Sequence, residues 1–387
     1  MQMQLIGDFE AVVKAVPLRP FDDKVLDFFN ELSKKLTKVR EYSDVATFGF
    51  WCRRAALLKE KSKYDDLHLR FGKGVVFHST PSNVPVNFAF SLAAGLLAGN
   101  ANIVRLPGKD FEQVDIIVNA IRELLENGCS ALAPYLCFVK YPPDKTLHDK
   151  FSAVCDVRII WGGDGTINEL RQSPLKARAI ELTFADRYSI AVIDADEYLK
   201  AENKQKITQD FYNDTYFSDQ NACTAPRIVF WIGEKKEAAK KEFWGNVREM
   251  AKEKYKLAPV QAVGKLAAFY KAAASMPLCL IDRSDSYVTR VGAEDVSEEL
   301  MNFKYNSGFY FEHDIDELKD ILPLCGERLQ TLIYYGLSQA DLTAFFSEHR
   351  PKGIDRAVPM GKSMDFTLIW DGYDLIRQLS RKISVLG

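Results

Sequence analysis

Apolar residues near the start of the chain recur at helical spacing. Between residues 22 and 39 five of them follow one another three or four positions apart, namely Val25, Phe29, Leu32, Leu36 and Val39. Asp22 and Asp23 precede them as a helix start. A second helix is expected from Ser43 or Asp44 to about Lys59. Lysines and aspartates fill the remaining positions, so this opening predicts helical packing and no chemistry.

From Gly72 the pattern changes to short apolar runs that alternate with amphipathic stretches. Buried strands are predicted at residues 74–79, 101–106, 135–140, 157–161 and 188–194, and helices at 87–98, 110–126, 146–153 and 165–172. Such alternation builds a doubly wound parallel sheet, whose ligands bind beyond the carboxyl ends of the strands. We therefore expect residues 72–195 to form a nucleotide-binding half.

The later part of the chain predicts a second, smaller α/β unit. A charged helix begins near Asp196, a Lys- and Glu-rich surface helix is expected over 234–255, and short apolar runs follow at 278–281, 308–311 and 331–335. The predicted organisation is a helical segment and nucleotide-binding domain over 1–205, a catalytic domain over 206–355, and a C-terminal segment over 356–387 that returns to the first domain.

Composition narrows the classes of protein and of partner. A length of 387 residues favours two domains, and a net charge of −2 gives no electrostatic footprint for nucleic acid. The seven cysteines are scattered and include no Cys-x-x-Cys pair, which argues for a reducing compartment and against a disulfide framework or a metal site. The start is not a signal peptide, and no uncharged apolar run reaches the roughly 18 residues of a membrane span. A cytoplasmic protein is expected.

The strongest candidate for chemistry is Cys223. Small and polar residues (217–222) precede it, and the apolar run 227–233 follows almost at once. A thiol between a polar turn and a buried strand is open to a substrate, and thiolates are strong nucleophiles. The alternative is a small buried side chain, which is the usual role of a cysteine.

Two further stretches lie where a doubly wound sheet places ligands. In the turn 78–85, Asn83 stands between Pro81 and Pro85, where its amide is positioned to stabilise an oxyanion or to cap the next helix. In Trp161-Gly-Gly-Asp-Gly-Thr166, glycines between a strand and a helix suit a phosphate. These letters also resemble the motif of diacylglycerol and NAD kinases, although no Gly-Thr-Gly-Asn element follows.

Together these stretches resemble the aldehyde dehydrogenase superfamily. Pro81-Ser-Asn83-Val-Pro85 is similar to its Pro-Trp-Asn-Phe-Pro element, and Trp161-Gly-Gly163 falls where the superfamily has Phe-Thr-Gly-Ser. Residues 100–107, the stretch Arg356-Ala-Val-Pro-Met-Gly-Lys-Ser-Met-Asp-Phe366 and Trp370-Asp-Gly-Tyr-Asp374 are closer to the bioluminescence-type long-chain acyl-CoA reductases (LuxC-type). The resemblance covers roughly residues 70–387. It implies an aldehyde dehydrogenase-like α/β fold with a cofactor domain and a catalytic domain.

The resemblance also implies a mechanism. Cys223 would attack an acyl thioester and carry the acyl group, while Asn83 and the backbone N–H of Cys223 hold the oxyanion. Glu181, in Glu-Leu-Thr-Phe184, is the counterpart of the general base, but the two glycines of the superfamily motif are replaced and the spacing to Cys223 is longer. A misplaced base fits reduction better than oxidation, and a purely structural role at a strand end is equally open.

A nicotinamide cofactor follows from the same resemblance. The residues expected near it are Ser79, Thr80, Pro81, Arg105, Lys109, Gly162, Gly163 and Thr166. Arg105 and Lys109 are two cations without a carboxylate before Asp110, which favours the 2′-phosphate of NADPH over NADH.

The predicted function is therefore reduction of an acyl thioester to an aldehyde. The acyl group would come from long-chain acyl-CoA or from an acyl-protein synthetase partner, and no metal is required. The alternatives are an aldehyde dehydrogenase that forms the acid, a lipid or NAD kinase built on residues 162–166, and a scaffold without catalysis. Full-length relatives assemble as oligomers, but this chain is shorter than most of them, so a homo-oligomer is left open.

Overall fold

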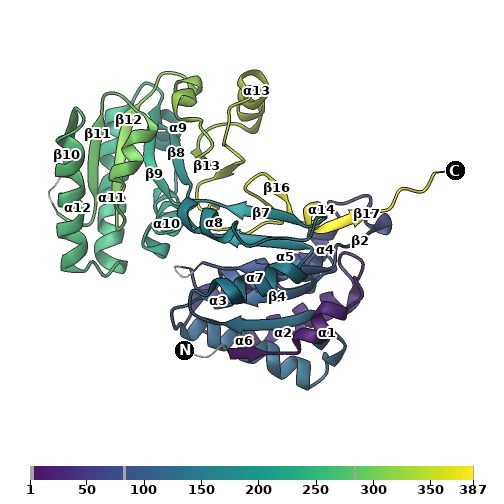
Figure 1. Ribbon diagram of the computed structural model, residues 1–387. Helices are drawn as coiled ribbons and strands as arrows, with labels where there is room; N and C mark the ends of the chain where they lie inside the picture. The colour runs from purple at the N-terminus through teal and green to yellow at the C-terminus, as the bar shows by residue number, and fades with distance from the viewer. Residues whose placement is uncertain (1–3, 82–83, 283–284, 387) are drawn as a thin grey trace. The chain divides into compact units, whose positions relative to one another are not determined.

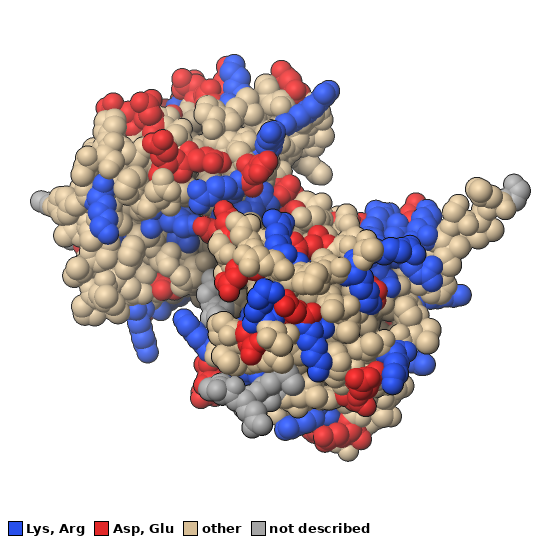
Figure 2. Space-filling view, viewed as in Figure 1, with Lys and Arg blue, Asp and Glu red and all other residues tan. Residues whose placement is uncertain are grey.

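The computed structural model describes residues 4–81, 84–282 and 285–386, and the chain divides into two compact units (Figure 1). The first unit comprises residues 1–185 together with 366–387, and the second comprises residues 186–365. Each unit is built around one sheet. Both signs of charge are distributed over the face seen in Figure 2, in keeping with the net charge of −2.

The sheet of the first unit has six strands in the order β1-β5-β4-β3-β6-β7. Its strands are β1 (Gln4–Ile6), β3 (Val75–Ser79), β4 (Ala101–Arg105), β5 (Leu136–Lys140), β6 (Val157–Trp161) and β7 (Ile180–Phe184). All neighbours are parallel except β1 and β5. The chain moves outward from β3 in one direction and then in the other, which is the predicted doubly wound order.

Helices cover this sheet. They are α1 (Phe9–Lys14), α2 (Asp23–Leu36), α3 (Ser43–Trp51), α4 (Arg54–Lys61), α5 (Asn87–Leu97), α6 (Glu112–Glu126), α7 (Lys145–Val154), α8 (Asp164–Leu170) and α14 (Leu375–Leu379), with the 3-10 turns η1 (Leu67–Leu69) and η2 (Ser130–Tyr135). Of these, α2, α5, α6, α7 and α8 lie where helices were predicted. Helix α5 is built of small and apolar residues and is almost entirely buried. Gly95 within it is required, since a methyl group there would collide with Asn102 Oδ1.

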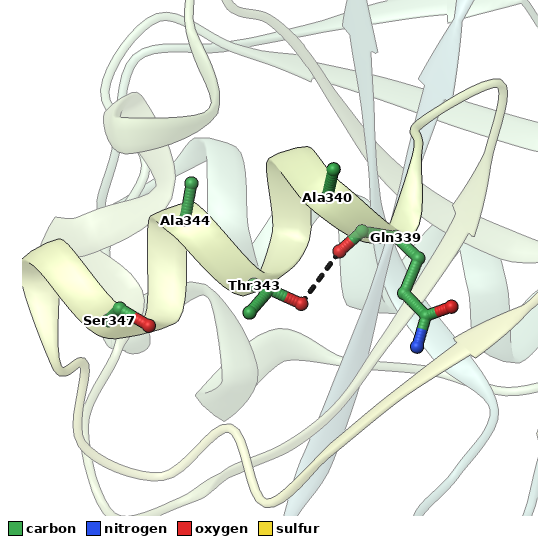
Figure 3. Close-up of a pocket in the computed structure, with 5 residues that line it drawn as sticks. All are labelled: Gln339, Ala340, Thr343, Ala344 and Ser347. Carbon is green, nitrogen blue, oxygen red and sulfur yellow. Dashed lines mark hydrogen bonds between the residues drawn. The ribbon is translucent and has the colours of Figure 1, made fainter.

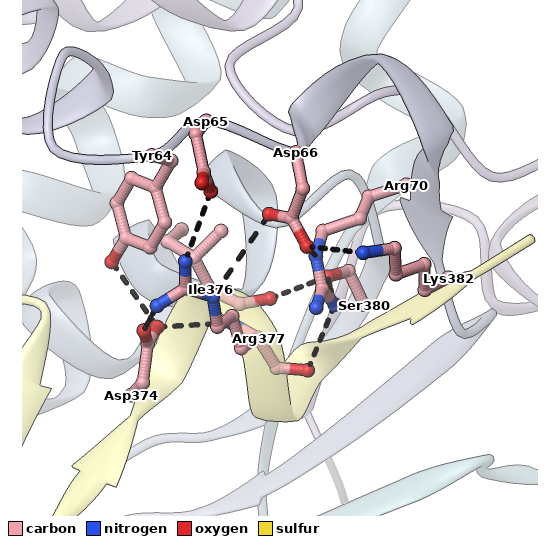
Figure 4. A network of polar contacts seen from close by, with 9 residues as sticks. All are labelled: Tyr64, Asp65, Asp66, Arg70, Asp374, Ile376, Arg377, Ser380 and Lys382. Carbon is pink, nitrogen blue, oxygen red and sulfur yellow. Dashed lines mark hydrogen bonds and ion pairs between the residues drawn. The ribbon is translucent and has the colours of Figure 1, made fainter.

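The C-terminal segment completes the first unit. Strand β17 (Ser380–Lys382) pairs antiparallel with β2 (Arg70–Gly72), and the two lie side by side in Figure 1. Polar contacts fasten the same segment: Figure 4 shows Asp66 between Arg70, Arg377 and Lys382. Buried Asn100 adds a hydrogen bond from its Nδ2 to Leu379 O at 2.9 Å. Residues far apart in sequence thus form one folded unit.

The second unit contains a seven-stranded sheet in the order β10-β11-β12-β9-β8-β13-β14. These strands are β8 (Tyr188–Asp194), β9 (Pro226–Ile232), β10 (Leu278–Asp282), β11 (Thr289–Ala293), β12 (Phe309–Asp314), β13 (Leu329–Tyr335) and β14 (Arg356–Pro359). Only β10 and β11 pair antiparallel. The small hairpin β15 (Ile369–Trp370) and β16 (Tyr373–Asp374) belongs to the first unit.

The second sheet buries separate apolar clusters on its two faces. Its helices are α9 (Ala195–Lys200), α10 (Lys204–Asp214), α11 (Lys236–Lys254), α12 (Pro259–Ala273) and α13 (Gln339–His349), with 3-10 turns η3 (Tyr216–Ser218), η4 (Glu298–Phe303) and η5 (Leu318–Leu324). No helix among the described residues combines the length and the apolar character that a membrane crossing demands.

The unit boundaries differ from the expected ones. Strand β8 was assigned to the nucleotide-binding half with a boundary near residue 205, but it pairs with β9 and β13 and belongs to the second sheet. Likewise, β14 and the turn after it lie in the second unit, and the chain returns to the first unit only from Phe366. A continuously apolar strand does not reveal which of two parallel sheets it enters.

Candidate active site

Cys223 lies in the loop between η3 and β9, at the amino end of a central strand of the second sheet, and is half-buried. Ser189 Oγ, on the neighbouring β8, donates a hydrogen bond of 2.8 Å to the carbonyl oxygen of Cys223. Thr224 Oγ1 contacts Met364 Sδ at 3.4 Å. The predicted setting of this thiol, a polar turn followed by a buried strand, is confirmed.

The buried side chain of Gln220 fixes the shape of this loop. Its Nε2 donates to the carbonyls of Pro226 and Phe309, and its Oε1 accepts from the N–H groups of Gly308 and Phe309, at 3.0–3.2 Å. Gln220 has φ of 55° and Asp219 of 52°, both in the left-handed region that non-glycine residues rarely adopt. The hydrogen bonds of the Gln220 side chain thus stabilise a left-handed backbone conformation that would otherwise be unfavourable for these residues.

The carboxylate of Asp219 makes a second anchor. It accepts from Ser307 Oγ at 2.7 Å, from Gln261 Nε2 at 3.2 Å and from the Tyr255 hydroxyl. These partners come from α12, from the end of α11 and from the turn before β12. The segment that leads to Cys223 is therefore tied to three separate parts of the second unit.

The late Pro-Met-Gly turn is also held inside the second unit. Asp214, buried at the end of α10, accepts from the N–H of Gly361 at 2.6 Å and from the N–H and hydroxyl of Ser363 at 3.0 and 2.8 Å. Burial nevertheless raises the pKa of Asp214 to about 6. The turn thus has a titratable clamp within its own unit.

In the first unit, the residues after β3 and β4 line the carboxyl edge of the sheet. Ser79 and Thr80 are buried, and Thr80 Oγ1 donates to Arg105 O at 2.6 Å. Pro81 is half-buried, whereas Asn83 lies outside the residues that the structure describes. The oxyanion role of Asn83 therefore stays a prediction.

The glycine-rich turn begins helix α8 as predicted. Gly163 is the residue before the helix, Thr166 is exposed on its first turn, and a Cβ atom at Gly163 or Gly165 would meet open space. A Cβ at Gly162 would instead lie 3.2 Å from Thr166 Cγ2. No packing demand explains glycine at 163 or 165, so the open space suits the close approach of a ligand to the backbone.

A buried relay supports this turn. Trp161 Nε1 donates to Ser91 Oγ at 3.0 Å, Ser91 lies 2.8 Å from His78 Nδ1, and His78 Nε2 lies 3.0 Å from Asn102 Oδ1. Burial lowers the pKa of His78 to about 4, which keeps it neutral. Because both ring nitrogens are engaged in the core, His78 is a packing residue and not a base for Cys223.

Several buried polar atoms near Arg105, at the ends of β4 and β5, lack hydrogen-bond partners within the part of the chain that the structure describes. The guanidinium lies 4.7 Å from the ring centroid of Tyr141, and Arg105 Nε, the Tyr141 hydroxyl and both nitrogens of His148 are buried without hydrogen-bond partners among the described residues. Burial, with the cations of Arg158 and Arg105, lowers the pKa of His148 to about 4. Lys109 is fully exposed nearby in the sequence. Buried polar groups ordinarily find partners, so this cluster fits a polar ligand.

Glu181 is placed differently from a general base. Its Oε2 accepts from Arg158 Nε and Nη2 at 2.8 and 2.5 Å, and its Oε1 accepts from Arg171 Nε at 2.7 Å. Arg158 is 2% exposed and also binds Ser152 Oγ and Ser173 O. Both carboxylate oxygens are engaged by guanidinium groups, so the structural alternative for Glu181 is favoured.

The sequence missed the groups that shape the cysteine loop. Gln220 lies in a loop, Asp214 at the end of a helix and Arg227 near the start of β9. No periodic signal marks these three as buried, and their burial depends on partners up to 149 residues away. The predicted cofactor residues and Glu181 lie in the first unit, and Cys223 lies in the second. No group of three or more metal-binding side chains occurs within the described ranges.

Two surface hollows lie away from these residues. Figure 3 shows a shallow one over α13, lined by Gln339, Ala340, Thr343, Ala344 and Ser347, with no ionisable group. Another, between α11 and the ends of β11 and β12, includes Lys240, Cys279 and His313. It opens at the opposite end of the second sheet from Cys223, because β9 and β12 are parallel.

Comparison with known proteins finds a reductase relative in sequence and dehydrogenases in structure. The long-chain acyl-protein thioester reductase of Vibrio harveyi is 25% identical over 171 residues, which is 44% of this chain and 34% of that protein. A lactaldehyde dehydrogenase structure (TM-score 0.65, 10% identity) covers 95% of this chain and 86% of that one. An indole-3-acetaldehyde dehydrogenase complexed with NAD+ (TM-score 0.66, 12% identity) covers 97% of this chain and 85% of that one.

The structural likenesses confirm the expected aldehyde dehydrogenase-like α/β fold. The sequence itself matches the acyl-CoA reductase (LuxC) family over residues 53–292, a stretch that includes Cys223, Gln220 and the glycine-rich turn. This match argues against the kinase interpretation of residues 162–166. The chain belongs to the acyl-CoA reductase (LuxC) family.

Proposed function

We propose that this protein reduces an acyl thioester to an aldehyde through an acyl group carried on Cys223. The observation that carries the proposal is the construction of the cysteine loop, where Gln220 and Asp219 hold a strained backbone in front of a half-buried thiol. Loops that are over-determined in this way are typical of reacting groups. Family membership supplies the reaction class.

The thiolate of Cys223 would attack the carbonyl carbon of the acyl thioester. A tetrahedral oxyanion forms, the coenzyme thiolate leaves and takes up a proton, and the acyl group remains on Sγ as a new thioester. Exchange of one thioester for another is nearly thermoneutral, so no separate activation is needed. The N–H of Cys223 and the amide of Asn83 are the proposed donors to the oxyanion.

A reduced nicotinamide, when bound, would supply the hydride that converts the acyl group to the aldehyde. Gly162, Gly163 and Thr166 are proposed to hold its phosphates or nicotinamide at the start of α8, with Ser79, Thr80 and Pro81 at the adjoining strand end. For the adenosine end we propose Arg105 and Lys109. The unpartnered atoms of Arg105, Tyr141 and His148 favour a 2′-phosphate, and hence NADPH over NADH.

The contacts of Glu181 bear on the direction of the reaction. An aldehyde dehydrogenase needs a base that activates water against the acyl-enzyme, and an acyl reductase must keep that water away. Glu181 is committed to Arg158 and Arg171, which favours reduction. Oxidation of an aldehyde to the acid is the second candidate, because the fold is shared with aldehyde dehydrogenases.

The donor of the acyl group is proposed as long-chain acyl-CoA or an acyl-protein synthetase partner. The support is that the Vibrio relative is named an acyl-protein thioester reductase. The proposed compartment is the cytoplasm, where the seven free cysteines would stay reduced. A homo-oligomer is compatible with the fold.

The decisive experiment is the mass of the protein after incubation with an acyl-CoA and no nicotinamide. One acyl group should appear on the peptide that contains Cys223, and it should disappear as aldehyde when NADPH is added. The Cys223→Ala variant should acquire no acyl group. If the wild-type protein acquires no acyl group from acyl-CoA of any chain length, the proposal is wrong. If it rapidly forms the acid from an aldehyde with NADP+ or NAD+, the dehydrogenase alternative is favoured.

A further inference from the structure

Arg227 is a buried cation without a carboxylate partner. Its residue is 6% exposed, and within the described part of the chain no Asp or Glu oxygen lies at ion-pair distance from it. Its Nη1 donates to Tyr305 O at 2.9 Å and to Asn306 Oδ1 at 2.8 Å, and its Nη2 donates to Gln220 O. All three acceptors are uncharged. Burial of an unneutralised charge costs free energy, so the presence of an unpaired arginine at position 227 calls for an explanation.

Two other buried arginines show the contrast. Arg158 is neutralised by Glu181 at 2.5 Å, and Arg290, on β11 of the same unit, is neutralised by Glu312 at 2.6 Å. Of these three arginines, only Arg227 has no carboxylate acceptor: its hydrogen bonds go to backbone carbonyls and a side-chain amide around the cysteine loop. The positive charge of Arg227 is therefore not cancelled by a carboxylate, and its electrostatic field can stabilise a neighbouring anion.

The neighbouring group is Cys223. Arg227 follows it by four residues, binds the carbonyl three residues before it, and interacts electrostatically with it. The other titratable groups that face Arg227 are Tyr310 on β12, Asp186 before β8 and Asp219 in the loop. Asp186 is itself paired with Lys304, and Asp219 is bonded to Ser307, Gln261 and Tyr255. Burial lowers the pKa of Arg227 only to about 10, so it stays charged at neutral pH.

The histidines of the chain have other positions. His68 lies in η1 of the first unit, and His78 and His148 are buried in the same unit. In the second unit, His313 Nδ1 bonds Ala293 O at 2.7 Å at the far end of the sheet, and His349 ends α13. The second unit thus offers an arginine, and not a histidine, in the immediate sequence and hydrogen-bond surroundings of the loop. A nearby cation such as an arginine favours the ionised form of a thiol.

We propose that Arg227 is the positioning residue that stabilises the thiolate of Cys223. It acts by holding an unneutralised guanidinium against the loop that carries the sulfur, while its three hydrogen bonds fix that loop. The S–H proton leaves to solvent, and the electron pair on sulfur then attacks the acyl carbon. This inference rests on the proposed function only in taking Cys223 as the nucleophile.

The test measures the alkylation rate of Cys223 by iodoacetamide from pH 5 to pH 10, read peptide by peptide by mass spectrometry. No substrate or cofactor is needed, so the result is independent of acyl transfer. Wild-type Cys223 should react with a midpoint clearly below the ordinary thiol value of about 8.5, and below that of exposed Cys279 in the same molecule. Arg227→Met should raise the Cys223 midpoint by about one pH unit, with alkylation near pH 7 about tenfold slower.

Three variants separate charge from tethering. Arg227→Lys keeps the charge and should keep most of the shift, and Asn306→Ala removes one acceptor and should leave the midpoint in place. Arg290→Met, which removes a buried but neutralised arginine, should lower stability without moving the Cys223 profile.

An unchanged midpoint in folded Arg227→Met overturns the proposal. Should that variant not fold, a wild-type midpoint at or above that of Cys279 overturns it equally. Failure of the proposed function would look different: a low Cys223 midpoint with no acyl group acquired from any acyl-CoA.

Discussion

Asp214 and Ser363 are joined by two hydrogen bonds, from the N–H of Ser363 at 3.0 Å and from its hydroxyl at 2.8 Å. The contact links the end of α10 to the last turn of the second unit, across 149 residues of sequence. Three donors surround a carboxylate that burial still holds at a raised pKa of about 6. Desolvation therefore outweighs the hydrogen bonds, and the clamp is sensitive to pH.

The first prediction concerns the stability of this clamp. The folded-state pKa of Asp214 lies above its ordinary value of 3.8, so its contribution to stability is full below pH 4 and is lost as pH rises through about 6. The difference in unfolding free energy between wild type and Asp214→Ala should shrink by about 1.4 kcal/mol between pH 5 and pH 8. Urea unfolding at the two pH values measures it. A constant or growing difference would contradict the assigned direction.

The second prediction concerns Glu181. Glu181→Gln removes the partner of buried Arg158 and should lower the free energy of unfolding by about 3 kcal/mol. Turnover per folded molecule should stay within about twofold of wild type, because the proposed acyl reduction does not use this carboxylate. Glu169→Gln, at an exposed carboxylate on α8, serves as the control and should change neither quantity. Loss of turnover in folded Glu181→Gln would restore the catalytic assignment.

The third prediction distinguishes two kinds of glycine. Gly95→Ala should destabilise the protein by about 1–3 kcal/mol, because the methyl group overlaps Asn102 Oδ1. Gly163→Ala should change stability by less than about 1 kcal/mol and weaken nicotinamide binding about tenfold, because the methyl group occupies the open space in front of α8. Gly245→Ala, also open but on α11, is the matched control. Unchanged cofactor affinity in Gly163→Ala would remove that turn from the cofactor site.

The fourth prediction concerns cofactor choice. Arg105→Met should reduce the preference for NADPH over NADH by at least about tenfold, since a charge-assisted hydrogen bond to the 2′-phosphate would be lost. Lys109→Met, at an exposed position, should have a smaller effect in the same direction. The ratio of kcat/KM for the two cofactors is the measurement. An equal loss with both cofactors would assign Arg105 to a shared part of the dinucleotide.

The sequence was most informative where local pattern and structure coincide. The strands β3, β4, β5 and β6 and the helices α2, α5, α6 and α7 follow from continuous apolar runs and 3.6-residue periodicity, within three residues at each end. The helix expected from 43 to 59 is instead two, α3 and α4, divided at Cys52 and Arg53. Helix α12 was not predicted, because apolar Val260, Val263 and Tyr270 occupy its exposed positions, so the sequence lacks the polar face that usually marks a surface helix.

Long-range relationships were not legible in the sequence. Strand β8 looks like a member of the first sheet because its partners β9 and β13 lie far along the chain. The position of Cys223 between a turn and a strand was predictable from its immediate neighbours. The burial of Gln220 and Arg227 was not, since both depend on residues of the turn before β12, about 80 positions later.

The pairing of β17 with β2 has a consequence for synthesis. Arg70 and Ser380, which share a hydrogen bond of 3.2 Å, emerge from the ribosome 310 residues apart. The second unit is one continuous segment and has all its strands once residue 365 is clear of the exit tunnel, whereas the first must wait for residues 366–382. The half that is translated first is therefore finished last, and β2 stays an open edge through nearly the whole of translation.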